Sequence, residues 1–560
     1  MRKRQCVCGS VSAVIFLIGV GLLVAGLTVV LKVFPDIVNN SVKKQKVLGL
    51  NSDGTLNDFT KQWATPSYIS TIQYWAFDYK NTIGIMNRAL YPDMDEKGPY
   101  AYDETIINDH ISFTDNGERM KYAQAYRYNF NPAKSCPTCD PKKDTVTIPD
   151  ISFFVGMEQI QEFLEKVLGN EELVGFCHMI MEPEKCAELA KLIDRELGVF
   201  LSLFKTGPFV TVTVDELLFS GYVSPIVTRL FDRVIDITNK LIGTEFKHID
   251  PENFTVALNT ENGTTDTIYT VDSGKVDSSR AGYILSFANM TNASLPSQGN
   301  KLPSEWWPAA ETPTCNSYAL MLEGTDGDFF KSFLDKNERL PLYVDDICRT
   351  AELLYEKEVT VKGIDGYRYV LPPDQFNYSI SDNCGFCNPN SLSKYGAYNV
   401  PKNGSCLPSG LLDISGCQSA PIIISKPHFY QASDIVQAFV PRFKSSYDDE
   451  TTLDIEPMTG TVLSAKKRLQ INLLVNQFPT IAAYSVIRPG AYPLVWLNES
   501  FLIDDGTKND LQSSLFTPQK TIKIVCWSAV GVGAFLIVLS GVLVLISIFC
   551  LGDKGIKKDD

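Results

Sequence analysis

Two long apolar runs without a charged residue, one near each end of the chain, constrain the fold most. The first extends from Gln5 to Leu31 and the second from Ile524 to Gly552. A helix of about 20 apolar residues crosses the roughly 30 Å hydrocarbon core of a bilayer, and a helix inside a soluble domain is rarely so uniformly apolar. We therefore expect transmembrane helices at 9–33 and 524–550.

The first run has a competing interpretation, a cleavable signal peptide. The apolar region of a signal peptide has about 7–15 residues and ends in a small-x-small cleavage site. Here the run is longer and continues into Leu31-Lys-Val-Phe-Pro35 without such a site. These features predict an uncleaved signal anchor.

Basic residues predict the orientation. Positive charges precede the first run and follow the second, which places both termini in the cytosol. The tails, 1–8 and 551–560, are then cytosolic, and 34–523 is a large ectodomain. Lysines just after the first run, such as Lys32 and Lys43, favour the opposite orientation weakly. The glycosylation sequons indicate that the middle of the chain lies on the lumenal or extracellular side of the membrane. They are Asn253, Asn262, Asn289, Asn292, Asn377, Asn403 and Asn498.

The cysteines support the same compartment. Of the 14 cysteines, four lie at 384, 387, 406 and 417, around the sequon at Asn403. Cysteines clustered around a glycan acceptor are typical of disulfides in an oxidising compartment. A zinc site at Cys384-Gly-Phe-Cys387 is the alternative, which the lack of a second nearby CxxC pair disfavours. Spacing alone suggests two further bonds, Cys136–Cys139 and Cys177–Cys186.

The cytosolic tails are too short to fold into a signalling domain. Cys6, Cys8 and Cys550 lie at the cytosolic faces of the spans, where palmitoylation and free thiols are both reasonable expectations. The terminal Lys557-Lys-Asp-Asp560 has the form of a dilysine retrieval signal. Localisation at the plasma membrane is expected, with the membrane of lysosomes or endosomes as the alternative.

Charge and motifs exclude several functions. The formal net charge is −14, and an acidic exterior offers no footprint for nucleic acid. No HExxH, GxSxG, P-loop or dinucleotide motif occurs. The four histidines are scattered and predict no metal site. We therefore expect a protein that is not an enzyme and that has no cofactor.

Hydrophobic periodicity predicts an α+β ectodomain. Aromatic or apolar residues alternate with polar ones at 71–77 and 122–130, as in half-buried strands, and strand-like runs return near 366–371, 422–425 and 469–475. Apolar residues at helical spacing cluster at about 155–242. In the membrane runs, Gly21 and Ala25, and Ala529 and Gly533, are spaced for close helix packing.

Nine segments between the two apolar runs have distinctive sequences: KGPYAY (97–102), TVDELLFSGY (213–222), LEGTDGDFF (322–330), LYVDDICRT (342–350), KGIDGYRYVLPP (362–373), GLLDISGCQSAPIIISKPHF (410–429), TTLDIEPMTGTV (451–462), AKKRLQINLLV (465–475) and YPLVWLNES (492–500). These segments, and their order from the first span to the last, resemble the class B scavenger receptor family, which includes fatty-acid translocases, lipoprotein receptors and a lysosomal integral membrane protein.

The resemblance implies an antiparallel β-barrel-like core with an internal tunnel and a helical apex bundle at about 155–242. It also implies three disulfides, Cys315–Cys384, Cys348–Cys417 and Cys387–Cys406. The pairs Cys136–Cys139 and Cys177–Cys186 fall outside the family's pattern.

The function implied by the resemblance is a scavenger-type cell-surface receptor. It would bind lipids or lipoproteins at the apex and pass apolar cargo through the tunnel to the membrane. The expected partners are fatty acids, cholesterol or cholesteryl esters, and modified lipoproteins or anionic lipids; a homo-oligomer is compatible with the sequence. Lys205 is the nearest counterpart of the family's ligand lysine and Lys191 is a second candidate; the alternative for each is an ordinary solvated side chain. His178 is a candidate pH sensor or a structural histidine.

Two other functions compete. One family branch carries a partner protein to lysosomes or exports lipid there, but its acidic dileucine-type tail signal is missing here. A two-span ion channel is the second rival, and it is disfavoured because neither span contains an ionisable side chain.

Overall fold

A computed structural model of the chain contains two compact units, one made of Met1–Val47 with Ile503–Asp560 and the other of Leu48–Leu502. The structure describes residues 2–66, 69–155, 208–224, 255–259, 262–263, 267–289, 296–312, 315, 317–388, 406–418, 420–476 and 487–552, with the single residues 195, 229, 232 and 236.

The terminal unit is helical. It contains two helices that are long and apolar enough to cross a membrane, within Val11–Gln45 and Asp505–Ile548. Each is interrupted by one π-helical turn. Along the chain its segments are α1 (Arg2–Thr28), η1 (Val29–Val33), α2 (Phe34–Gln45), α11 (Asp505–Leu511), η14 (Gln512–Phe516) and α12 (Thr517–Gly552).

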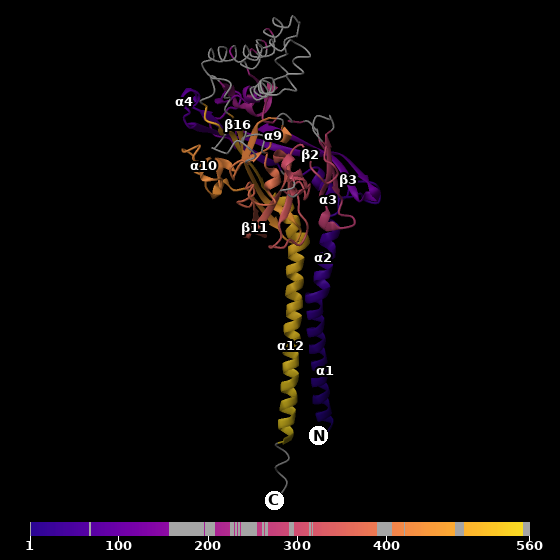
Figure 1. Cartoon of the computed structure of the whole chain (residues 1–560). Coiled ribbons are helices and arrows are strands. Elements are labelled where there is room, and N and C mark those ends of the chain that lie inside the picture. The colour runs from indigo at the N-terminus through magenta and orange to yellow at the C-terminus, as the bar shows by residue number, and fades with distance from the viewer. Residues whose placement is uncertain are drawn as a thin grey trace. The chain divides into compact units, whose positions relative to one another are not determined.

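Helices α1 and α12 lie side by side (Figure 1), with glycines at their contact. A Cβ atom added to Gly533 would lie 2.7 Å from the carbonyl oxygen of Gly19, and one added to Gly26 would lie 2.8 Å from Val530. The pairing of Gly21 predicted from spacing is wrong, since a Cβ there would meet nothing within 4 Å. Gly19 and Gly26 are seven residues apart and therefore share a helix face. Gly21 lies two residues after Gly19, which turns it by about 200° around the helix axis and away from α12.

The larger unit is built on one antiparallel sheet of 13 strands, which confirms the predicted fold class. The strand-like runs of the sequence all lie in it. Its main path is, in spatial order, β10 (Leu340–Val344), β11 (Arg349–Val361), β12 (Ile364–Val370), β15 (Thr452–Glu456), β16 (Thr461–Val475), β17 (Gly490–Leu502), β1 (Ser70–Tyr79), β2 (Met94–Thr114), β3 (Arg119–Phe130), β8 (Thr267–Asp272) and β9 (Ile284–Asn289).

Four more strands form two small sheets, and a two-stranded branch of the main sheet joins β16 through one of its strands. The small sheets are β4 (Thr145–Pro149) with β5 (Phe209–Thr213), and β6 (Tyr222–Val223) with β7 (Thr255–Val256). In the branch, β13 (Leu412–Asp413) pairs with β14 (Ile422–Ser425), which pairs with β16. The short α-helices within the described residues of this unit are α3 (Asp58–Ala64), α4 (Thr82–Arg88), α9 (Ser415–Gln418) and α10 (Asp434–Gln437).

Hydrogen bonds nearly close the sheet. The N–H of Ile284 on β9 donates to the carbonyl of Gly324 over 2.9 Å, and the N–H of Tyr343 on β10 donates to the carbonyl of Thr325 over 3.0 Å. One short segment therefore satisfies backbone groups on both edge strands. The rings of Phe287 and Tyr343 stack across the same seam with centroids 5.7 Å apart. The result is barrel-like, with an inner and an outer face.

Four disulfides join described cysteines: Cys136–Cys139, Cys315–Cys384, Cys348–Cys417 and Cys387–Cys406. The predicted pair Cys177–Cys186 lies outside the described residues, as does most of the predicted helical block 155–242. Within that block the structure describes strands β5 and β6. Valines and threonines dominate Phe209–Thr213, which suits a pleated strand.

Candidate functional site

The inner face of the closed sheet carries a cluster of charged side chains. Lys467 on β16 lies opposite Glu499 on β17, with the ammonium 3.0 Å from the carboxylate. Lys467 also pairs with Asp346, in the 3₁₀ turn η8 (Asp345–Ile347) that follows β10. Strands β10 and β16 are separated by three intervening strands along the sheet path. A contact between them therefore crosses the inside of the sheet.

The turn η8 contacts a third part of the inner face. The hydroxyl of Tyr269 on β8 donates to Asp345 over 3.3 Å. Lys467, Asp346 and Glu499 nevertheless keep 34%, 55% and 25% of their side-chain surface exposed. Side chains that point inward and still retain exposed surface show that the inner face is incompletely filled.

The environment of Lys467 favours its charge. Burial lowers the pKa of this ammonium, but the attraction of Asp346, Glu499 and Asp345 outweighs it, and the pKa rises well above its usual value. Lys467 is therefore a fixed cation on the inner face. It lies between the carboxylates of Asp346 in η8 and Glu499 on β17.

Glu104 on β2 adds a buried carboxyl to this cluster. Only 3% of the residue is exposed, and Oε2 has no hydrogen-bond partner among the described residues. Burial and the negative charge of Glu499 raise its pKa well above the usual value, although Lys467 and Tyr128 act in the opposite direction. Glu104 therefore binds a proton more readily than an ordinary glutamate.

Two further carboxyls lie beside the aromatic lining. The hydroxyl of Tyr122 donates to Asp326 over 3.0 Å. Burial raises the pKa of Asp326, and burial together with the charge of Asp326 raises that of Asp328. Because two close carboxylates repel each other, this pair retains a proton more readily than separated aspartates do.

Aromatic rings line the inner face around these charges. Tyr102 and Tyr128 contact the ring of Phe219, at 4.8 and 5.4 Å between centroids, and Phe219 comes from the π-helical turn η3 (Glu216–Ser220). Tyr122 and Tyr269 stack at 5.5 Å. Rings with hydroxyl groups provide an apolar surface for an acyl chain and polar contacts for its head group.

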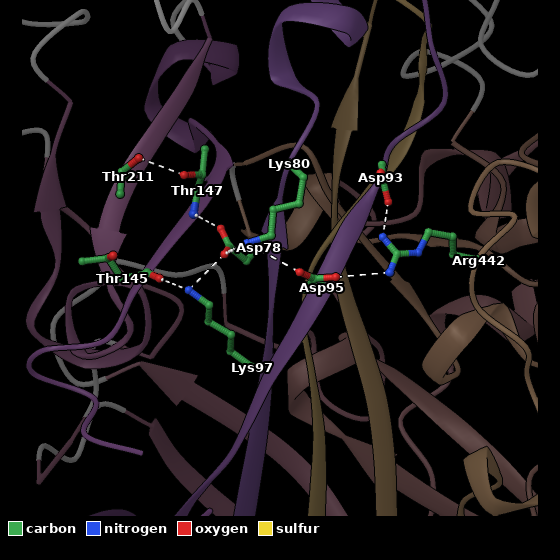
Figure 2. A network of polar contacts seen from close by, with 9 residues as sticks. All are labelled: Asp78, Lys80, Asp93, Asp95, Lys97, Thr145, Thr147, Thr211 and Arg442. Carbon is green, nitrogen blue, oxygen red and sulfur yellow. Dashed lines mark hydrogen bonds and ion pairs between the residues drawn. The ribbon is translucent and has the colours of Figure 1, made fainter. Parts of the chain in front are cut away.

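A second polar network lies where β1 and β2 meet the small β4–β5 sheet (Figure 2). Asp78 on β1 accepts a hydrogen bond from the N–H of Thr147 on β4 over 2.9 Å and pairs with Lys97 at 2.9 Å and with Lys80. Lys97 also donates to the carbonyl of Thr145 over 2.7 Å. The network therefore binds the small β4–β5 sheet to the main sheet. Burial raises the pKa of Asp78, but the hydrogen bonds outweigh it and the pKa is lowered.

Figure 2 also shows how this network continues on the far side of Lys80. Lys80 lies 3.6 Å from Asp95, which in turn lies 3.2 Å from the guanidinium of Arg442. Arg442 pairs with Asp93 as well. Positive and negative groups alternate through the whole network.

His428 forms a second balanced contact outside the inner cluster. Its Nδ1 lies 2.8 Å from Asp449 and its Nε2 lies 2.6 Å from Glu96. Burial lowers the pKa of His428, but the two carboxylates outweigh it and raise the pKa to about 9. His428 is therefore a charged link between β2 and the segment before β15, in agreement with a structural role.

Asp150 lies directly after β4. Its carboxyl is fully buried, and it accepts hydrogen bonds from Ser224 and from the N–H of Phe153 at 3.3 Å. Burial raises its pKa to about 6, despite these hydrogen bonds. Asp150 therefore joins the segment after β4 to Ser224, the residue after β6.

Several predicted site residues cannot be placed. Lys191, Lys205, His178, Asn253, Asn292, Asn403 and the terminal Lys557-Lys-Asp-Asp560 lie outside the described residues, as do the side chains of Cys6, Cys8, Cys550 and Asn289. Asn262 is exposed, and Asn377 and Asn498 are half-buried. Among the described residues no group of three His, Cys, Asp or Glu is placed to hold a metal ion.

The sequence reasoning missed the inner cluster. Lys467 and Glu499 belong to strands whose neighbouring inward positions are apolar, Leu469 and Leu497. A charged residue at a position where the alternation of the strand predicts an apolar one was therefore the signal that could have identified Lys467 and Glu499. Asp346 could not be found this way, because it lies in a turn.

The fold and the inner face define a class: membrane proteins with a candidate span near each end of the chain and a large, nearly closed antiparallel sheet. The family model described as the CD36 family matches residues 17–544. The chain therefore belongs to the CD36 family, and the resemblance to class B scavenger receptors is confirmed.

The relatives agree with this assignment. An uncharacterized protein of Caenorhabditis elegans is 54% identical over 566 residues, which cover 100% of both chains. Human lysosome membrane protein 2 is 30% identical over 511 residues, covering 91% of this chain and 88% of the relative. Sensory neuron membrane protein 1 of Mamestra brassicae is 25% identical over 520 residues, covering 92% and 87%. The family consists of receptors.

Proposed function

We propose that this protein is a non-enzymatic lipid receptor that binds lipids or lipoproteins at its apex and passes apolar cargo along the inside of the sheet to the membrane. The observation that carries the proposal is the exposed surface of inward-pointing side chains, above all Lys467 and Asp346. An enclosed face that is accessible and aromatic is a route for an acyl chain.

The physical advantage of such a route is large. A hydrocarbon chain gains roughly 0.8 kcal/mol for each CH₂ group removed from water. An enclosed apolar path therefore lowers the barrier to crossing the aqueous layer without a chemical step. In this proposal Lys191 and Lys205 bind anionic lipid surfaces at the apex, and the apolar cargo moves along the inner face.

The test is uptake of a fluorescent cholesteryl ester by cells that express the chain. Ile106 on β2 is in phase with Glu104, so Ile106→Trp places a large ring on the inner face. Thr105→Trp is the matched control, because Thr105 points to the other face of the same strand. We expect uptake to fall at least fivefold in the first variant and to stay near wild type in the second, at equal surface staining. Equal uptake by both variants contradicts the route.

A second test addresses the apex. The double variant Lys191→Ala/Lys205→Ala should lower uptake of modified, anionic lipoprotein several-fold and leave transfer of uncharged lipid unchanged. A variant that takes up the lipoprotein normally contradicts the assignment of these lysines.

The relative named lysosome membrane protein 2 favours one alternative, a receptor of the lysosomal or endosomal membrane that traffics a partner protein or exports lipid. Immunofluorescence of the untagged chain distinguishes the two locations. If the chain is intracellular and takes up no lipid, a pull-down at neutral and acidic pH is the next experiment, with His178→Ala as the variant that abolishes the pH dependence.

A further inference from the structure

The charges on the inner face are strongly unbalanced. Five carboxyls belong to this face or to the segments against it, whereas the one cation that pairs with them among the described residues is Lys467. Glu104, Asp326 and Asp328 form no ion pair with a described residue. The five carboxyls are Glu104, Asp326, Asp328, Asp346 and Glu499.

The excess of negative charge remains when the most buried carboxyls are protonated. If Glu104 and the pair Asp326 and Asp328 are all neutral, the two carboxylates Asp346 and Glu499 still face the single cation Lys467. In an enclosed space the effective dielectric constant is lower than in water, so the excess negative charge acts strongly on a ligand. A fatty acid carboxylate is repelled there, and a cation is attracted.

The buried carboxyl of Glu104 is a second, independent sign of a ligand. Its Oε2 accepts no hydrogen bond from a described residue, although the residue is 97% buried. Buried polar atoms are nearly always satisfied, and one left without a partner costs stability. The hydroxyl of Tyr102, on the same inner side of β2, also has no hydrogen-bond partner in the part of the chain that the structure describes. A donor group that enters the inner face would satisfy both.

The aromatic lining suits the same ligand. Tyr74, Tyr102, Tyr128 and Phe219 form one contiguous cluster beside Glu104, with centroid distances of 4.8–6.1 Å. The faces of such rings attract ammonium groups, and carboxylates beside them strengthen the attraction. The rings also cover the hydrocarbon that follows the head group.

We propose that the inner face binds the cationic head of a single-chain amphiphile, a long-chain amine in its protonated form, between Asp346, Glu499 and Glu104. This inference rests on the proposed lipid route and names the cargo class that the route prefers. Lys467 then acts as the cation that the ligand displaces from Glu499 and Asp346.

The test uses the purified full-length chain in nanodiscs and three photoactivatable C16 probes that differ only at the head: an amine, an alcohol and a carboxylate. Crosslinking to the chain is measured against unlabelled competitor at pH 7.4. We expect the amine to bind at least tenfold more tightly than the carboxylate, with the alcohol between them. C16 lysophosphatidylcholine is a fourth competitor; tighter binding of this zwitterion than of the amine overturns the choice of a net cation.

Variants locate the site. Asp346→Asn and Glu499→Gln should each weaken amine binding about tenfold and leave alcohol binding unchanged. Glu104→Gln should do the same, and Lys467→Met should strengthen amine binding. Glu118→Gln, at an exposed turn, is the control with the same loss of one charge. Melting temperatures show which variants are folded.

The outcomes separate this inference from the proposed function. If the carboxylate binds as tightly as the amine, or if the variants bind the amine normally, the inference is overturned and the lipid route remains. If none of the probes crosslinks to the folded chain, both are overturned. Since protonation removes the negative charges, amine binding of the wild type should also weaken between pH 7.4 and pH 4.5, and unchanged binding contradicts the proposal.

Discussion

The network around Asp78 and the inner cluster around Lys467 are built from the same residue types and differ in charge balance. In the first, Asp78 contacts two lysines and a backbone N–H, and Arg442 lies between two aspartates. In the second, one lysine faces an excess of carboxyls. The network around Asp78 satisfies its own charges, whereas the inner cluster does not.

This difference separates a structural role from a functional one. A balanced network stabilises the fold, because each desolvated charge has a partner. An unbalanced cluster lowers stability and is retained where a ligand uses it. Substitution of a carboxylate should therefore have opposite effects on stability in the two regions, which the following predictions test.

The largest effect is expected for Asp78→Ala. The substitution removes the acceptor of the Thr147 N–H and the anionic partner of Lys97. Loss of one partner of a buried ion pair costs about 3–4 kcal/mol. The free energy of unfolding of the chain in detergent measures this loss. Because the pKa of Asp78 is lowered, its contribution is present above pH 4 and disappears as the pH falls below that value. Asp58→Ala, an exposed carboxylate, should change stability by less than about 0.5 kcal/mol.

His428→Gln tests a second balanced contact. A pKa raised from 6.5 to about 9 corresponds to about 3 kcal/mol of stability. This contribution is fully present below pH 6.5 and is lost as the pH rises through 9. We therefore expect the variant to melt well below the wild type at pH 6 and close to it at pH 9.5. A constant difference across this range contradicts the charged link.

Asp150→Asn tests a buried carboxyl that has hydrogen-bond donors and no cation among its described contacts. Because its pKa is raised to about 6, the ionised form lowers stability at neutral pH. Replacement by the neutral isostere should raise the free energy of unfolding by about 2 kcal/mol at pH 7.5. The gain should vanish below pH 4, where the aspartate is protonated in both folded and unfolded chains. A loss at pH 7.5 would place Asp150 among the balanced contacts.

Glu104→Gln tests the inner cluster itself. Burial and Glu499 raise the pKa of Glu104 well above its usual value, so the charged form is unfavourable in the folded chain. The melting temperature at pH 8 should rise, and at pH 4 it should not change. A melting temperature lowered at pH 8 shows that the inner cluster is balanced, like the network around Asp78.

Several strands of the sheet could be predicted because they show local alternation or apolar runs, as at 71–77 and 469–475. The identity of the inner face could not, since it depends on the pairing of β16 with β17 and on the turn after β10. The helix contact shows the same limit. Gly533 was identified by its small size, but its partner Gly19 depends on the rotation of α1 about its axis.

The sheet also determines when the chain is able to fold. The first strand, β1, pairs with the last, β17, and the side chains of Gln73 and Asn498 meet across 425 residues of sequence. At roughly 5–20 residues per second, synthesis of that interval takes about 20–85 s. Throughout this time β1 has an unpaired edge. The larger unit therefore completes its central sheet only when synthesis has almost reached α12, and the edge of β1 needs protection from wrong pairing for most of its translation.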